Sequence, residues 1–347
     1  MQQQLTSYMQ AGVPVILWGP PGVGKTATVE ALARATGAHL ETVILSVRDP
    51  ADVGGYPIPP TERGAGVALE PPAWAVRLAE AAQAGRPAIL FLDELTTAPP
   101  SVQAAALRVV LDRAVGELQL PRSVWVVAAA NPPEHAAGAA AALPPPLANR
   151  FAHLNVEPNP GDWAAHYPAY WGAEPPGGDS PQYAAERARI AAFIRRRPEL
   201  LLRVPADPDE ASRAWPSPRA WDHAARAAAA GGGDESVAAC VGEGAAAEYV
   251  AWRRAEGDLP DPADVVAGRA ELPPREREDA RLAALMALAA YCGRERGALP
   301  VTERLLRDEP LDVLLVVGQA LAAALGGPAK VPASIIRRLA QAQRSLA

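Results

Sequence analysis

Residues 19–26 read GPPGVGKT, between a short apolar run and a helical pattern. In this stretch Gly19 and Gly24 stand five positions apart, and Lys25 and Thr26 follow directly, which is the pattern of a phosphate-binding loop. Glycine allows successive backbone N–H groups to turn inward around a phosphate, and the N-terminus of the following helix adds a positive partial charge. The sequence therefore predicts a strand, a phosphate loop and a helix in succession.

Lysine is rare in this chain. Lys25 and Lys330 are the only two lysines among 33 basic residues, and the rest are arginines. A compact ammonium on a flexible stem reaches the β and γ oxygens of a nucleotide, whereas the guanidinium is a broad planar fork. The Thr26 hydroxyl would contact Mg²⁺. We therefore expect ATP and Mg²⁺ as cofactors, with the nucleotide held by Gly19, Pro20, Pro21, Gly22, Val23, Gly24, Lys25, Thr26 and Ala27. The alternative is a glycine-rich turn that carries a lysine by chance.

Strand and helix patterns alternate along the first 157 residues. Such alternation predicts a parallel sheet covered by helices, and hence an α/β domain at 1–157. The expected strands are 13–18, 39–47, 87–95, 123–132 and 150–158, and the expected helices are 25–37, 72–85 and 100–114, with a short hairpin at 115–121.

Extended apolar runs cease after about residue 158. Residues 166–182 are rich in proline, glycine and polar residues, which is typical of a surface loop or linker. Helical patterns dominate the remainder, so we expect an α-helical domain at 158–347. The expected helices are 183–204, 217–233, 277–293, 309–325 and 331–346.

The overall composition narrows the class of protein. A net charge of −6 argues against nucleic acid as the main partner. The apolar stretch 311–325 is too short to span a bilayer, and the N-terminus lacks the pattern of a signal peptide. Cys240 and Cys292 are expected to be ordinary buried thiols, so we expect a cytoplasmic protein of a reducing compartment. The basic run IRRRPELL at 194–201 is expected to be a solvated helix face.

Polar side chains follow two of the apolar strands. Asp93 and Glu94 end the run ILFLDEL, and Asn131 ends the run VVAAANP. The carboxyl edge of a parallel sheet is where ligands bind, so Asp93 is expected to hold Mg²⁺ together with Thr26. Glu94 would orient the attacking water or accept its proton, and Asn131 would bind the γ-phosphate or the water. The alternatives are a solvated acidic pair and a simple Asn-Pro turn.

These motifs resemble those of AAA+ ATPases, and most closely those of the MoxR branch. The resemblance rests on GPPGVGKT (19–26), FLDEL (91–95), AAANP (128–132), ALPPPLANRF (142–151) and WPSPRAW (215–221), which come in the family's order. It covers residues 13–221, whereas residues 235–347 carry no matching motif. It implies a P-loop NTPase core with a five-stranded parallel sheet, followed by a mainly helical lid. It also implies ATP hydrolysis at the subunit interfaces of a hexameric ring.

Two arginines take their expected roles from this resemblance. Arg150 matches the arginine finger, which reaches the nucleotide of a neighbouring subunit, and Arg219 matches the second sensor at the start of a lid helix. Whether Arg219 serves its own site or the neighbouring one stays open, and either arginine could instead form a surface salt bridge. The segment 48–72 would line the pore of the ring, where Tyr56 either faces a client or packs under its own loop.

The function implied by the resemblance is the remodelling or maturation of a partner protein or complex. Members of the branch often work with a client or adaptor protein that carries a von Willebrand factor A domain. A nucleic-acid motor or restriction-type NTPase is a second hypothesis, against which the acidic charge argues. A nucleotide-gated scaffold with little turnover is a third, against which the presence of Asp93, Glu94 and Arg150 argues.

Overall fold

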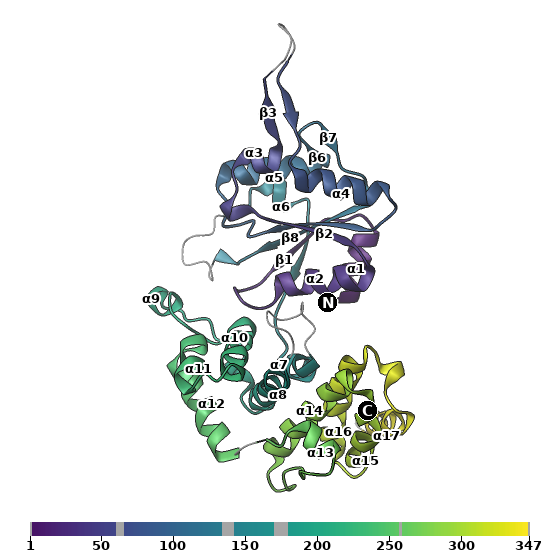
Figure 1. Ribbon diagram of the computed structural model, residues 1–347. Helices are drawn as coiled ribbons and strands as arrows, with labels where there is room; N and C mark the ends of the chain where they lie inside the picture. The colour runs from purple at the N-terminus through teal and green to yellow at the C-terminus, as the bar shows by residue number, and fades with distance from the viewer. Residues whose placement is uncertain (1, 60–65, 134–141, 170–179, 257–258, 346–347) are drawn as a thin grey trace. The chain divides into compact units, whose positions relative to one another are not determined.

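The computed structural model describes residues 2–59, 66–133, 142–169, 180–256 and 259–345. The chain divides into two compact units, Met1–Glu157 and Pro158–Ala347. The first is an α/β unit and the second is helical (Figure 1).

A five-stranded parallel sheet forms the centre of the α/β unit, as the sequence predicts. Its strands are β1 (Val15–Trp18), β2 (His39–Ile44), β5 (Ala88–Asp93), β8 (Val124–Ala130) and β9 (Ala152–Asn155), in the order β2-β5-β8-β1-β9. The residues of β5 and β8 are almost all apolar and buried because helices cover both faces of these central strands. The order inserts β1 between β8 and β9, so the loop after β1 starts beside the end of β8.

Helices surround this sheet (Figure 1). They are α1 (Gln2–Gln10), α2 (Lys25–Thr36), α3 (Pro50–Gly54), α4 (Ala73–Gln83), α5 (Pro100–Asp112) and α6 (Pro145–Ala148). Trp74 and Leu78 of α4 pack with Leu90 and Leu92 of β5 in one buried cluster. Alternate residues of β5 point to opposite faces, so Phe91 is buried on the other side. Burial on both faces fixes the register of the strands on which the site is built.

The segment after β2 differs from the simple strand and loop that we expected. β2 ends at Ile44 and a 3₁₀ turn follows at Leu45–Val47. Within 48–72 the chain forms α3 and an antiparallel hairpin of β3 (Tyr56–Ile58) and β4 (Ala68–Glu70). β3 contains a proline and its three residues are exposed, so no pattern of buried and exposed positions predicts a strand there.

A second hairpin, β6 (Ala114–Val115) with β7 (Leu118–Gln119), lies where a short hairpin was predicted. Its turn is hydrogen-bonded to the end of α3 and to the first hairpin: the Gly116 N–H donates to Gly54 O, and the Glu117 N–H donates to Leu69 O, each over 2.9 Å. Gly116 has a φ of 60°, and a Cβ there would clash with the carbonyl oxygen of Leu69. Only glycine allows so close an approach of the two backbones.

The second unit contains helices and no strand in its described part. They are α7 (Pro160–His166), α8 (Pro181–Arg196), α9 (Pro208–Ala211), α10 (Pro218–Ala229), α11 (Asp234–Val241), α12 (Glu243–Glu256), α13 (Pro262–Val266), α14 (Glu278–Arg294), α15 (Leu299–Leu306), α16 (Leu311–Leu325) and α17 (Ala333–Ser345). α14 is buried along most of its length because it packs against both α8 and α16. The core of the helical unit includes an aromatic cluster of Phe193, Trp221, Tyr249 and Trp252.

Several predicted boundaries in the helical unit were wrong. The helix expected at 183–204 ends at Arg196, because Pro198 disfavours helical backbone at the residue before it and removes an N–H. α11, α12 and α15 lie in segments where no helix was predicted. Of the linker expected at 166–182, residues 170–179 lie outside the described part, whereas Tyr167–Ala169 form a 3₁₀ turn. Within the described residues, no helix combines the length and apolarity that crossing a bilayer requires.

Candidate nucleotide-binding site

The predicted phosphate loop joins β1 to α2. Gly24 is the N-cap of α2 and has a φ of 97°, a left-handed conformation that glycine adopts without steric cost. The backbone amides of the first helical turn have no partner within the helix, and the helix dipole places positive charge there. The loop therefore presents an anion-binding helix N-terminus directly after a strand of the sheet.

Lys25 is the first residue of α2, and its side chain folds back over the loop. Its ammonium donates to Gly19 O over 2.6 Å, to Pro20 O over 3.0 Å and to Asn131 Oδ1 over 2.8 Å. The residue is only 9% exposed. An ammonium has three N–H donors, so these three bonds use all of them. Contact with a phosphate oxygen would have to replace at least one of these acceptors.

Thr26, at the start of α2, forms a hydrogen bond with Asp93, at the end of β5. The Thr26 hydroxyl donates to Asp93 Oδ2 over 3.0 Å, although the two residues are 67 positions apart. Magnesium prefers oxygen ligands and is commonly held by one or two carboxylates together with substrate phosphates and water. The described residues contain no cluster of three or more His, Cys, Asp or Glu side chains that could hold a metal alone. The Thr26–Asp93 pair thus fits an ion that arrives with a nucleotide.

Glu94 has unusual backbone geometry for a residue with a side chain. Its φ is 57°. The Glu94 N–H donates to Asp93 Oδ1 over 2.9 Å, the Thr97 hydroxyl donates to Glu94 O over 3.0 Å, and the Leu95 N–H donates to the carbonyl of β8 residue Ala129. These bonds hold the strained turn, and strain of this kind is concentrated at functional sites. The exposed Glu94 carboxylate accepts a hydrogen bond from the Ser46 hydroxyl.

Hydrogen bonds hold both the side chain and the backbone of Asn131. Its side-chain oxygen accepts from Lys25, its N–H donates to Thr96 Oγ1 over 3.3 Å, and its carbonyl accepts from the same Thr96 hydroxyl over 3.1 Å. Thr96 is 1% exposed. The amide of Asn131 is therefore held beside the ammonium by a buried side chain from the turn that carries Glu94.

The two predicted arginines stand on elements other than those that carry this group of side chains. Arg150 follows the short helix α6 in the α/β unit, and Arg219 stands in the first turn of α10 in the helical unit. Both are exposed, and neither side chain has a hydrogen bond or ion pair to the residues that the structure describes. Two hydrogen bonds fix the start of α10. The Ser217 hydroxyl caps the helix by accepting from the Ala220 N–H, and the buried Trp221 indole donates to Leu200 O over 2.7 Å.

Sequence reasoning missed two residues of the site. Ser46 lies in the turn after β2, whose Ile44 is paired with Asp93, so it comes next to Glu94 at the same sheet edge. Thr96 lies two residues beyond Glu94. A polar residue just after the second predicted strand was the available signal for Ser46. Nothing local distinguishes Thr96 from Thr97.

The comparisons with known proteins agree with this geometry. Residues 15–155 match the family model for AAA, the ATPase family associated with various cellular activities. Over 128 residues the chain is 39% identical to ATPase family gene 2 protein homolog B of Homo sapiens, which covers 35% of this chain and 15% of that protein. The Bos taurus protein of the same name is 37% identical over 130 residues, again 35% of this chain and 15% of the relative.

This chain thus spans only 15% of the length of these curated relatives. The match falls on the unit that carries the loop, the carboxylates and Asn131. The α/β unit is an AAA ATPase domain, and together with the helical unit it has the AAA+ fold. A domain of this class implies nucleotide binding, usually with Mg²⁺, and usually assembles into rings.

Proposed function

We propose that this protein is a cytoplasmic ATPase of the MoxR type, which hydrolyses ATP at the subunit interfaces of a ring and uses the cycle to remodel or mature a partner protein. The observation that carries the proposal is the pair of hydrogen bonds from the phosphate loop to the strand ends, Lys25 to Asn131 and Thr26 to Asp93. They join a cation, an oxygen pair for Mg²⁺ and a polar amide in one place.

Each residue has a proposed task in this site. The loop Gly19–Ala27 would hold the phosphates through its amides and Lys25, and Thr26 with Asp93 would hold Mg²⁺, which supplies positive charge against the phosphate oxygens. Glu94 would orient the attacking water. Its Oε2 accepts a hydrogen bond from Ser46, which holds the carboxylate beside the turn after β2 and leaves Oε1 to accept from a water.

The ring arrangement is proposed from the two exposed arginines. A guanidinium without a partner among the described residues of its own chain suits a contact supplied to another subunit, and Arg150 would neutralise charge on a neighbour's γ-phosphate. Arg219 would act as the second sensor. We propose a hexamer, and a client or adaptor protein that carries a von Willebrand factor A domain, on the MoxR resemblance alone.

The direct test measures ATP binding and phosphate release. Lys25→Ala should abolish binding, because the ammonium and its place in the loop are lost. The matched control is Lys330→Ala, which removes the only other lysine, an exposed one, and should leave binding unchanged. Nucleotide affinity that survives Lys25→Ala would refute the assignment of the loop.

The partner is tested with Glu94→Gln protein held in ATP. This variant should bind nucleotide but not hydrolyse it, so it should retain its partner in a pull-down and show the assembly state by its mass. Stimulation of the wild-type ATPase by DNA or RNA would instead support the nucleic-acid motor. A Glu94→Gln variant with the full biological output would support the scaffold.

A further inference from the structure

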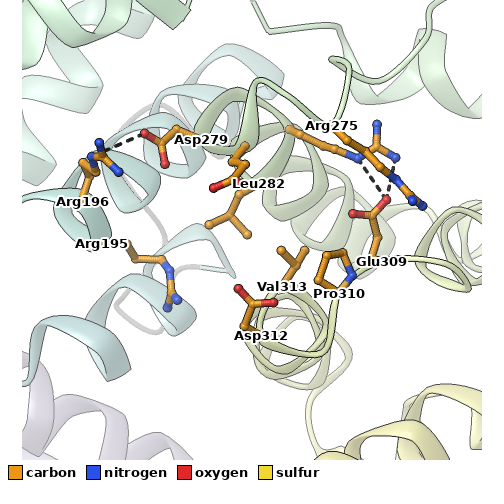
Figure 2. Close-up of a pocket in the computed structure, with 11 residues that line it drawn as sticks. Arg195, Arg196, Arg275, Asp279, Leu282, Glu309, Pro310, Asp312 and Val313 are labelled. Atoms are coloured by element: carbon orange, nitrogen blue, oxygen red, sulfur yellow. Dashed lines mark hydrogen bonds and ion pairs between the residues drawn. The ribbon is translucent and has the colours of Figure 1, made fainter.

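The pocket shown in Figure 2 lies in the helical unit, between the last turn of α8 and the first turns of α14 and α16, and has a volume of about 510 Å³. The run 194–201, expected to be a solvated helix face, supplies Arg195 and Arg196 to its lining. In all, four arginines and four carboxylates line it, so the lining is balanced in charge and favours neither an anion nor a cation. A more specific arrangement lies in the α/β unit, beside the turn that carries Arg150.

Arg150 stands in a tight turn between α6 and β9. The Phe151 N–H donates to Ala148 O over 3.3 Å and closes this turn. The buried side chains of Leu147 and Phe151 anchor the turn on either side, while the Arg150 side chain is exposed. Ala148 O is therefore the acceptor on which the turn that presents Arg150 closes.

His153, on β9, donates to the same carbonyl. Its Nε2 is 2.9 Å from Ala148 O, and its Nδ1 is 2.9 Å from Trp18 Nε1. An indole N–H can only donate and a carbonyl can only accept, so the imidazole is neutral and carries its proton on Nε2. The Trp18 indole also stacks on the imidazole, with ring centroids 5.9 Å apart and an interplanar angle of 15°. Trp18 thus fixes both the tautomer and the orientation in which His153 donates to Ala148 O.

Trp18 is the last residue of β1 and directly precedes the phosphate loop. Ile16 pairs with His153 across the parallel strands β1 and β9, so Trp18, two residues further on, points to the same face of the sheet. Beyond the strands, the Val156 N–H donates to Trp18 O over 2.6 Å, and a Cβ on Gly19 would lie 2.6 Å from Val156 O. The segments that carry the two rings are therefore packed together up to the first residue of the loop, and His153 ties the turn with Arg150 to them.

We propose that His153 is a positioning residue for Arg150, because it joins the turn that carries this arginine to Trp18 at the start of the phosphate loop. This role rests on the one proposed for Arg150, a finger supplied to a neighbouring subunit. The effect is then exerted in trans: His153 of one subunit holds the guanidinium that serves the neighbour's ATP. Loss of the imidazole should leave ATP binding intact and slow turnover at the neighbouring site.

The test measures ATP binding and phosphate release by the full chain. His153→Ala should bind ATP as the wild type does and release phosphate about tenfold more slowly, because a misplaced finger lowers rate rather than affinity. Mixed with Glu94→Gln subunits, which have intact fingers, it should regain activity, as Arg150→Ala should. The matched control is His39→Ala, which should leave every readout unchanged. His39 also has a side-chain contact, 2.9 Å from Nε2 to Glu41 Oε1, but it lies at the opposite end of the parallel strands.

Conservative variants separate the two bonds of His153. Glutamine places an N–H near the position of imidazole Nε2, whereas asparagine places its side-chain oxygen near that of Nδ1. His153→Gln should therefore keep most of the turnover through the bond to Ala148 O, and His153→Asn should be as slow as His153→Ala. If His153→Ala is unfolded by circular dichroism, Trp18→Phe takes its place. That variant keeps a stacked ring but removes the indole N–H, and it should show the same slow turnover and the same restoration by mixing.

Arg150→Ala is the reference that separates this proposal from the proposed function. If Arg150→Ala turns ATP over normally, or is not restored by Glu94→Gln subunits, the finger in trans fails and the role of His153 fails with it. If Arg150→Ala behaves as expected, three results overturn the role of His153 alone. They are normal turnover by His153→Ala, slow turnover that mixing does not restore, and His153→Asn as active as His153→Gln.

Discussion

The hydrogen bond between Lys25 and Asn131 makes an unusual prediction for the variant Asn131→Ala. The ammonium donates to Gly19 O, Pro20 O and Asn131 Oδ1, and of these three acceptors only the last belongs to a side chain. A hydrogen bond to a charged group contributes about 1.5–3 kcal/mol. Because Lys25 is buried, little water can replace the lost acceptor, so Asn131→Ala should lower the free energy of unfolding of the nucleotide-free protein by about that amount.

The same variant should not weaken ATP binding. In the wild type, Lys25 must give up at least one acceptor to contact a phosphate, and Asn131→Ala removes that competing bond beforehand. ATP affinity should therefore stay the same or rise. If Asn131 stabilises charge only in the transition state, turnover should fall about 10²–10³-fold, as when one donor is removed from a preorganised site.

Three measurements decide this: urea denaturation without nucleotide, titration with a fluorescent ATP analogue, and steady-state phosphate release. Asn155→Ala, at an exposed asparagine of the edge strand β9, is the matched control and should leave all three unchanged. The reasoning is refuted if ATP affinity falls in parallel with turnover, because Asn131 would then bind the nucleotide in its ground state. It is also refuted if Asn131→Ala is no less stable than Asn155→Ala.

Three other predictions concern the ring, the hairpins and a thiol. Arg150→Ala should bind ATP but not turn it over, and mixing it with Glu94→Gln subunits should restore some phosphate release if the finger acts in trans; mixed rings without activity would contradict this. Gly116→Ala should lose about 1–3 kcal/mol more stability in urea than Gly85→Ala, since both glycines have positive φ but only Gly116 joins two backbones, and equal losses would contradict this. Burial raises the pKa of Cys292, so iodoacetamide should label it at neutral pH only after unfolding, and rapid labelling of native protein would contradict this.

The sequence predicted the parts of the fold in which local pattern and burial agree. The buried strands β5 and β8 are apolar throughout, and α2 ends at Gly37 in the left-handed conformation that its position suggested. The hairpin β3–β4 was not predicted, because its exposed residues carry no alternation between a core face and a solvent face. α11 and α12 were missed for a related reason: the alanine-rich sequence has high helix propensity but few large apolar residues to mark a period.

The candidate site was predicted where a motif fixes the residue, and missed where only the tertiary structure does. Lys25, Thr26, Asp93 and Asn131 could be named because each stands at a recognisable place, a phosphate loop or the end of a buried strand. The bond from Ser46 to Glu94 depends on the order of β2 and β5 in the sheet, which periodicity does not give. Thr96 is also set by tertiary geometry, because its hydroxyl meets Asn131 only when β5 and β8 are adjacent.

The order of the strands also explains why Lys25, Asp93 and Asn131 come together at one edge of the sheet. The last residue of β1, Trp18, pairs with Ala130, so the chain leaves β1 for the phosphate loop at the level where β8 delivers Asn131. Since β5 pairs with β8 on the opposite side, the turn that carries Glu94 lies one strand further along the same edge. Lys25, Asp93 and Asn131 are therefore positioned by strands that are buried on both faces. These strands cannot shift register without exposing their core. What remains free to move is the set of side-chain bonds, from Lys25 to its acceptors and from Ser46 to Glu94, so nucleotide is expected to act by exchanging those bonds while the sheet keeps its register.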